Sequence, residues 1–225
     1  MHKTDPQSTS DMVFGSETTQ STLNAILSRR LPFPQSGKNS LLLYGSFGTG
    51  KTTYAPIFCK EFEQAIGDPT AEPFVETIAC DSTAKIDTIL KRCERIRSLV
   101  PQTSSYHYFV FDEVDNLTSD AQQRLKIFLN HVNIICVLTT NYVQKVDKGL
   151  RDRCYQLAMN AASDTQIALR VHKVLSQNQM RIDDNALNEI ISNSDGSMRD
   201  IVPIALAAAV SLKRVKPTKA LRVVK

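Results

Sequence analysis

The chain has 225 residues, a net charge of +4, 42% hydrophobic residues and a mean hydropathy of −0.21. This length allows one large domain, or a medium domain with a small one. No stretch is apolar for the length of a membrane span, and the first six residues lack the apolar core of a secretion signal. We therefore expect no membrane partner and an intracellular location, either the cytoplasm of a prokaryote or phage-infected cell or a eukaryotic nucleus.

The cysteines and the charge distribution exclude further classes of protein. The five cysteines lie far apart without a Cys-x-x-Cys pair, which argues against a zinc site and a disulfide framework. Residues 159–225 carry 10 Lys/Arg against 6 Asp/Glu, and residues 213–225 contain six bases and no acid. This basic tail either contacts phosphates or is a solvated end.

Strands and helices are expected to alternate through the first two thirds of the chain. After a polar N-terminus, the apolar patterns predict helices at 21–29, 51–65, 85–99 and 119–129, and strands at 41–44, 74–79, 106–111, 133–141 and 155–158. Such alternation is typical of an α/β fold with a parallel sheet covered by helices on both faces. Ligands then bind at the carboxyl ends of the strands.

Beyond residue 163 the pattern becomes purely helical. Three helices are expected, at 163–177, 184–193 and 197–214. We therefore divide the chain into a flexible N-terminus at 1–12, an α/β nucleotide-binding domain at 13–158, a small three-helix lid domain at 159–212 and the basic tail at 213–225.

A glycine-rich loop follows the first predicted strand and opens a helix. It consists of Gly45, Ser46, Phe47, Gly48, Thr49, Gly50, Lys51 and Thr52. In this arrangement backbone N–H groups and a helix N-terminus surround a phosphate chain, the lysine reaches the β- and γ-phosphates, and the threonine hydroxyl binds Mg²⁺. The alternative is a glycine-rich turn with an accidental lysine, but the complete pattern between strand and helix favours nucleotide binding.

Polar side chains end two later strands. Asp112 and Glu113 follow the strand at 106–111, where Asp112 fits a Mg²⁺ ligand and Glu113 fits the group that orients or deprotonates the attacking water. Asn141 ends the next strand, where its amide fits a sensor of the γ-phosphate. The plainer alternatives are a solvated pair of acids and an asparagine that caps a turn.

The order of these motifs resembles that of AAA+ ATPases and, within them, the clamp-loader subunits of replication factor C and its phage and archaeal relatives. The residues that carry this resemblance are 43–53, 109–117 with 121–122, 140–143, 150–154 and 195–200. They cover about residues 13–212. The resemblance implies a P-loop AAA+ fold, ATP and Mg²⁺ as cofactors, and a helical collar after the lid.

The resemblance also assigns roles to individual residues. Val13 and Phe14 would line the adenine pocket, and the phosphate loop would extend to Thr53. Arg153 matches the finger that enters a neighbouring subunit's ATP site, and Arg199 matches the second sensor, which reaches the γ-phosphate of its own subunit. Without the resemblance, both arginines would be assigned to the surface or to salt bridges.

Several positions depart from the clamp-loader pattern. Asp152 stands where the family has serine, so it could pair with Arg151 or Arg153, and Phe47 replaces the usual proline. The Tyr-Arg-Pro signature is missing. The sequence stops at Lys225, before a collar, which leaves a truncated subunit, a compact relative and a protein that assembles by other contacts as alternatives.

The predicted helix at 85–99 is basic. By the resemblance, Lys85, Lys91, Arg92 and Arg95 would contact the backbone of primed DNA, whereas a solvated face with Asp87 and Glu94 as partners explains the same residues. The expected partners are other AAA+ subunits in a homo- or hetero-oligomeric ring or spiral, DNA, and a sliding clamp.

The function expected from these features is that of a clamp-loader ATPase, in which hydrolysis between subunits loads a partner onto DNA. The alternatives are another AAA+ DNA machine, such as a helicase loader, replication initiator or transposition regulator, and an assembly subunit that switches with ATP but barely hydrolyses it.

Overall fold

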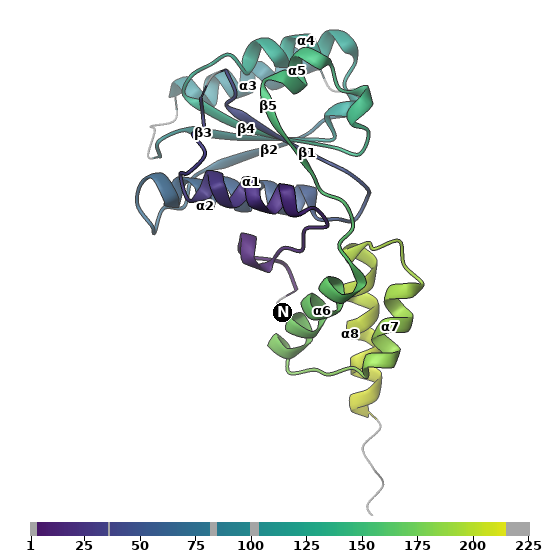
Figure 1. Ribbon diagram of the computed structural model, residues 1–225. Coiled ribbons are helices and arrows are strands. Elements are labelled where there is room, and N and C mark those ends of the chain that lie inside the picture. Colours follow the sequence, from purple (N-terminus) through teal and green to yellow (C-terminus); the bar gives the residue numbers. More distant parts are fainter. Residues whose placement is uncertain (1–3, 36, 82–84, 100–103, 215–225) are drawn as a thin grey trace, which may run out of the picture. The chain divides into compact units, whose positions relative to one another are not determined.

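The computed structural model describes residues 4–35, 37–81, 85–99 and 104–214 (Figure 1). Contacts within the chain divide it into two compact units, one comprising Asp5–Ala162 and the other beginning at Ser163. Most of the expected basic tail lies outside the described residues. Within the described residues, no helix combines the length and the apolar character needed to cross a bilayer.

A five-stranded parallel sheet forms the centre of the first unit. Its strands are β1 (Ser40–Tyr44), β2 (Val75–Ala79), β3 (His107–Asp112), β4 (Ile134–Thr140) and β5 (Cys154–Ala158), in the order β2-β3-β4-β1-β5. All seven residues of β4 are buried, as expected for a strand covered on both faces. The predicted parallel α/β sheet is thereby confirmed.

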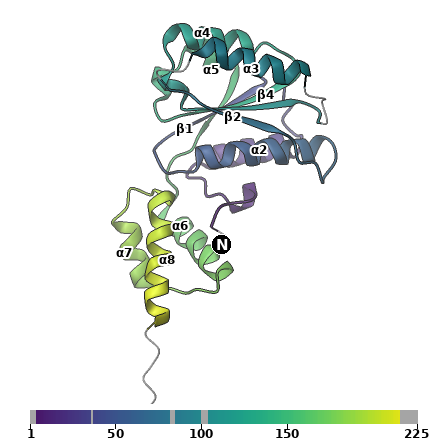
Figure 2. The same cartoon turned by 180° about the vertical axis from the view of Figure 1, so that it is seen from behind.

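Helices cover both faces of this sheet (Figures 1 and 2). One face carries α1 (Glu17–Leu27) and α2 (Lys51–Ile66), and the other carries α3 (Ile86–Leu99), α4 (Ser119–Phe128) and α5 (Lys148–Asp152). Adjacent strand residues serve opposite faces, so Leu41 and Leu43 belong to the core under α1 and α2, whereas Leu42 belongs to the other core. Packing on both faces holds the strands, and therefore the residues at their ends, in defined positions.

Two local predictions were wrong. The first helix begins at Glu17 rather than near residue 21, because the Ser16 hydroxyl accepts a hydrogen bond from the Thr19 N–H and caps the helix there. The short α5 was not predicted at all. Its five residues are too few to show a helical period, and the Asp147 side chain caps it by accepting from the Leu150 N–H.

The second unit consists of the three expected helices. These are α6 (Asp164–Gln177), α7 (Asp184–Ser192) and α8 (Met198–Arg214). Ser163 and Gln166 form a capping box at the start of α6. The apolar side chains of all three helices pack together, with Val171, Leu187 and Ile201 at most 2% exposed.

Candidate functional site

The glycine-rich loop connects the carboxyl end of β1 to the first residue of α2. Gly45 has φ +146°, and a Cβ atom there would lie 2.5 Å from the backbone oxygen of Met159. Gly50, the N-cap of α2, has φ +87°. Only glycine adopts these backbone angles without strain, and at Gly45 only glycine has the space. The loop therefore has its shape before any ligand binds.

Lys51 lies folded over this loop. The residue is 7% exposed, and its Nζ donates to the backbone oxygens of Gly45 at 3.0 Å and Ser46 at 2.6 Å. The Thr49 hydroxyl also donates to the Ser46 oxygen, at 3.0 Å. An ammonium held at the mouth of a helix N-terminus, where N–H groups lack partners within the helix, makes an anion-binding site.

The two groups expected to bind Mg²⁺ are in direct contact. Thr52, on the first turn of α2, donates its hydroxyl proton to Asp112 Oδ1 at 2.7 Å, and Thr139 donates to the same oxygen. Mg²⁺ prefers oxygen ligands and usually takes one or two carboxylates plus phosphate oxygens. Within the described part of the chain no cluster of three or more His, Cys, Asp or Glu forms. The donor set thus fits a Mg²⁺ ion shared with a phosphate chain.

Glu113 is held beside Asp112 in the left-handed region, at φ +58°. Its N–H donates to the Thr139 hydroxyl at 2.9 Å, and its Oε2 accepts from Asn116 Nδ2 at 3.1 Å. Asn116 also donates to the Cys80 oxygen at 3.2 Å, which links Glu113 to the end of β2. The left-handed backbone and the Asn116 hydrogen bond together fix the Glu113 carboxylate directly after β3.

Sequence reasoning missed Thr139 and Asn116 as supports of this site. The strand register would have identified Thr139, since Phe111 pairs with Leu138 and the next residues along the two strands are Asp112 and Thr139. No sequence signal identifies Asn116, because its amide reaches Glu113 only through the short turn that follows β3.

Asn141 lies directly after β4, at the same edge of the sheet. Its neighbour Thr140 donates to Asp115 Oδ1 at 2.6 Å and accepts from the Tyr142 N–H at 2.9 Å. The Asn141 side chain makes no hydrogen bond with another described residue. The anchored neighbours hold the backbone, and the amide of Asn141 stays available to a ligand.

Burial and the carboxylates of the site raise the pKa of one nearby thiol, that of Cys80. Burial, and then the charge of Asp112, raise the pKa of Cys80 to about 12. The thiol is therefore neutral at physiological pH and is no candidate nucleophile.

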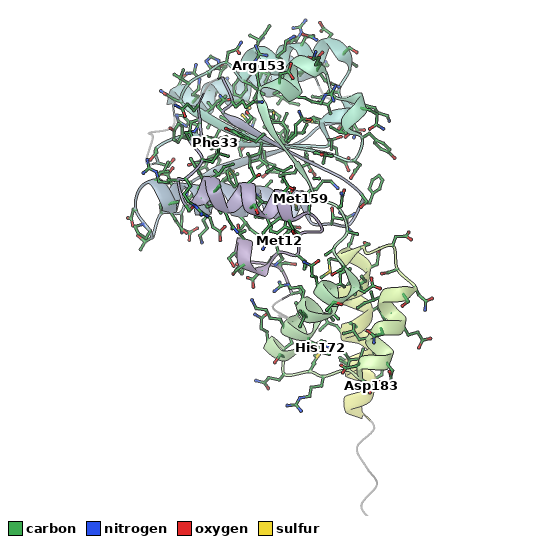
Figure 3. All side chains as sticks on the ribbon, in the orientation of Figure 1. Met12, Phe33, Arg153, Met159, His172 and Asp183 are labelled. Carbon is green, nitrogen blue, oxygen red and sulfur yellow. The ribbon has the colours of Figure 1, made fainter. Side chains whose placement is uncertain are left out.

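The expected adenine-pocket residues belong to the segment before α1. Phe14 is 4% exposed and packs edge to face on Tyr54, with ring centroids 5.5 Å apart. Val13 is partly buried beside it. Figure 3 shows Met12 and Met159 on the α1 and α2 side of the sheet, and both pack on the core of that face. The adenine role of Val13 and Phe14 stays a prediction.

Arg153 lies at the opposite end of the strands. It caps α5 directly before β5, where Cys154 pairs with Ser40, the first residue of β1. Its Nε donates to Asn130 Oδ1 and its Nη1 to the Gly149 oxygen, both at 2.9 Å. Asp152 makes no ion pair with a described residue, so the expected pairing with Arg151 or Arg153 does not occur.

The remaining predicted residues belong to other elements. Arg199 is exposed on α8 of the second unit, and its sensor role stays a prediction. On α3, Arg92 pairs with Glu76 at 2.6 Å, whereas Lys91 and Arg95, together with Lys85 directly before the helix, are exposed and form no ion pair within the described ranges. The carboxylates expected to neutralise these cations have other partners: Asp87 pairs with Arg124, and Glu94 with Arg97 and His131.

A family model described as "ATPase family associated with various cellular activities (AAA)" matches residues 41–160. The chain belongs to the AAA family. The match spans the sheet from β1 to β5 and includes the phosphate loop, Asp112, Glu113, Asn141 and Arg153.

This AAA protein is similar to curated proteins named replication factor C small subunit. The protein from Haloarcula marismortui is 27% identical over 205 residues, which are 90% of this chain and 60% of that protein. Small subunit 1 from Pyrobaculum arsenaticum is 29% identical over 178 residues, 78% of this chain and 53% of that protein. The chain thus spans little more than half the length of these relatives.

Solved structures share the fold at lower identity. A variant of RuvB from Thermotoga maritima superposes with a TM-score of 0.72 at 18% identity, covering 93% of this chain and 66% of that chain. The structure titled as the RuvB Holliday junction branch migration motor of the same organism gives 0.68, again at 18% identity. These matches show an AAA fold.

Proposed function

We propose that this AAA protein binds ATP with Mg²⁺, hydrolyses it at an interface between subunits, and uses the cycle to place a partner such as a sliding clamp on DNA. One contact carries the proposal: the Thr52 hydroxyl donates to Asp112 beside the ammonium of Lys51. That contact joins a Mg²⁺-binding pair to an anion-binding loop, which is what a nucleoside triphosphate requires.

The residues around this contact suit hydrolysis. Bound Mg²⁺ would neutralise charge on the β- and γ-phosphate oxygens, with Thr52 and Asp112 holding it. Glu113, one residue beyond Asp112, orients the attacking water and accepts its proton. Asn141, at the adjacent strand end, donates its amide to the water or to the γ-phosphate. The Lys51 ammonium exchanges its backbone carbonyl partners for phosphate oxygens.

Phosphoryl transfer develops charge that a further cation besides Lys51 stabilises, and Arg153 supplies this cation from another subunit. From Arg153 to Ala158, the β5 partner of Tyr44 at the start of the loop, five residues cover about 16 Å at ~3.3 Å per residue. An arginine side chain is far shorter than this distance. Arg153 is therefore directed to the phosphate site of an adjoining subunit rather than to its own.

Exposed cations on α3 and directly before it support contact with DNA. Lys85, Lys91 and Arg95 are not neutralised by described carboxylates, so they are available to phosphates. Loading of a clamp, in turn, rests on the similarity to replication factor C small subunits. We assign DNA backbone contact to this helix and clamp loading to the assembled subunits.

Mixing two inactive variants tests hydrolysis between subunits. Lys51→Ala disables the phosphate loop but keeps the finger, and Arg153→Ala does the opposite. Each alone should be inactive, and an equal mixture should recover about a quarter of wild-type turnover, since one interface in four combines an intact loop with an intact finger in a head-to-tail assembly. As control, Lys51→Ala mixed with the double variant should stay inactive.

Other outcomes of the mixing experiment contradict the proposal. A mixture as inactive as its components would refute the shared site, and a wild-type chain without turnover at any concentration would refute hydrolysis between copies of this chain. Clamp loading is tested separately by a pull-down of the sliding clamp from the same organism, with ATP and primed DNA present. Only a clamp loader should retain the clamp.

A further inference from the structure

Two exposed aromatic rings connect the phosphate loop to the strand end that carries Asn141. Phe47, inside the loop, is 57% exposed, and Tyr142, directly after Asn141, is 39% exposed. Their ring centroids lie 6.1 Å apart at an interplanar angle of 74°, an edge-to-face contact. The two rings bridge segments that are 95 residues apart in the sequence.

A cation holds the Tyr142 ring from another direction. Lys145 Nζ lies 4.3 Å from the ring centroid, within the range of a cation–π contact. The Tyr142 N–H donates to the Thr140 hydroxyl, which itself donates to Asp115. Tyr142 is thus oriented by its backbone, by Lys145 and by the ring of Phe47.

The contact is not part of either hydrophobic core. Neither Phe47 nor Tyr142 belongs to the two clusters of buried residues that hold the sheet and its helices together. The rings stay 57% and 39% exposed, so they bury a smaller share of their apolar surface than the core side chains do. The contact instead connects the loop to the residue directly after Asn141.

We propose that Phe47 and Tyr142 are positioning residues: their ring contact holds Asn141 at the correct distance from the phosphate loop. This inference rests on the proposed ATP hydrolysis. Phosphates bind mainly to backbone N–H groups and Lys51, so ATP affinity depends little on the rings. The turnover number depends on them more, because Asn141 must meet the γ-phosphate or the attacking water within a few tenths of an ångström.

A double-mutant cycle on turnover tests the coupling. Phe47→Ala and Tyr142→Ala should each lower kcat by about threefold to tenfold, the range of one aromatic pair, while the Kd for a fluorescent ATP analogue changes less than about twofold. The double variant should be no slower than the slower single variant. Tyr142→Phe keeps the ring and should rescue kcat. Phe74→Ala, at a ring that is 58% exposed outside this contact, should leave kcat and Kd unchanged.

A second measurement does not depend on catalysis. In hydrogen-exchange mass spectrometry of the ligand-free chain, Phe47→Ala should speed exchange in the peptide around Tyr142, and Tyr142→Ala should speed exchange in the phosphate loop. Additive losses of kcat, equal effects on Kd, or exchange that stays local to each substitution would overturn the inference. If the wild-type chain hydrolyses no ATP, the proposed function fails, and the exchange experiment still decides whether the rings couple the two segments.

Discussion

The two ends of the parallel sheet differ in what they present. At the carboxyl ends of β1, β3 and β4 lie the phosphate loop, Asp112, Glu113 and Asn141, and hydrogen bonds of Thr52 and Thr139 connect the loop with the two acids. At the amino end of β5 lies Arg153, bonded to Asn130 and Gly149. Under the proposed function, one chain carries both the phosphate loop and the arginine finger, separated by about the length of a strand, so assembly of subunits would join them.

Removing the cation at the amino end has the largest expected effect. Arg153→Ala should lower kcat by a factor on the order of 10³–10⁵, the share of the rate that arginine fingers supply, and leave the Kd for ATP nearly unchanged. Steady-state phosphate release and equilibrium titration measure the two quantities. Arg124→Ala, which removes an exposed arginine on α4, is the matched control. A parallel rise of Kd in Arg153→Ala would mean that the arginine serves its own loop.

Removing the base at the carboxyl end should have the next largest effect. Glu113→Gln keeps the shape and the Asn116 contact but cannot accept a proton, so kcat should fall by about 10²–10⁴ with ATP binding retained. Single-turnover hydrolysis with excess protein measures the chemical step. Asp120→Asn, at an exposed carboxylate on α4, should behave as wild type. Normal turnover in Glu113→Gln would favour a switch that needs no base.

A smaller effect is expected inside the carboxyl-end network. Thr139→Val preserves shape but leaves the Glu113 N–H without its acceptor and Asp112 without one donor. An unsatisfied buried donor costs about 1–3 kcal/mol, so the free energy of unfolding in urea should fall by that amount. Thr139→Ser retains the hydroxyl and should lose less. Unchanged stability in Thr139→Val would show that the network does not hold the two acids.

The smallest expected difference between the two edges of the sheet is in the reactivity of two cysteine thiols, Cys80 and Cys154. Burial raises the pKa of Cys80 to about 12, with Asp112 adding to the shift, and burial raises that of Cys154 to about 12 against the charges of Lys38 and Arg153. About one thiol in 10⁴ is then ionised at pH 8, so both should resist iodoacetamide alike, and labelling should rise with pH.

Asp112→Asn sharpens this thiol comparison. The variant removes a negative charge beside Cys80 and none near Cys154, so the pKa of Cys80 should fall and its labelling should become faster than that of Cys154. Peptide mass spectrometry measures both sites in one sample. Fast labelling of Cys80 in the unmodified chain would contradict a buried, neutral thiol at the carboxyl edge.

Sequence reasoning located the strands and most helices because their apolar periods are strong, and it located the loop because glycines and lysine stand at fixed spacing between them. Sequence reasoning failed where the start or the existence of a helix depends on only a few residues. The start of α1 depends on the Ser16 cap, and α5 is a five-residue helix that begins at the Asp147 cap. It also offered Asp87 and Glu94 as partners of Lys85, Lys91, Arg92 and Arg95, whereas Asp87 pairs with Arg124, and Glu94 pairs with Arg97 and His131.

By itself, the sequence determined the parallel sheet, the phosphate loop and the identity of the acids at the strand ends, because these follow from local period, glycine spacing and the rule that parallel strands end at one edge. Only the tertiary structure decided that Thr139 serves both acids, that Asn116 holds Glu113, that Phe47 meets Tyr142, and that Arg153 lies a strand length from its own loop. These are contacts between residues distant along the chain, and their distances depend on register and packing, which no local pattern encodes.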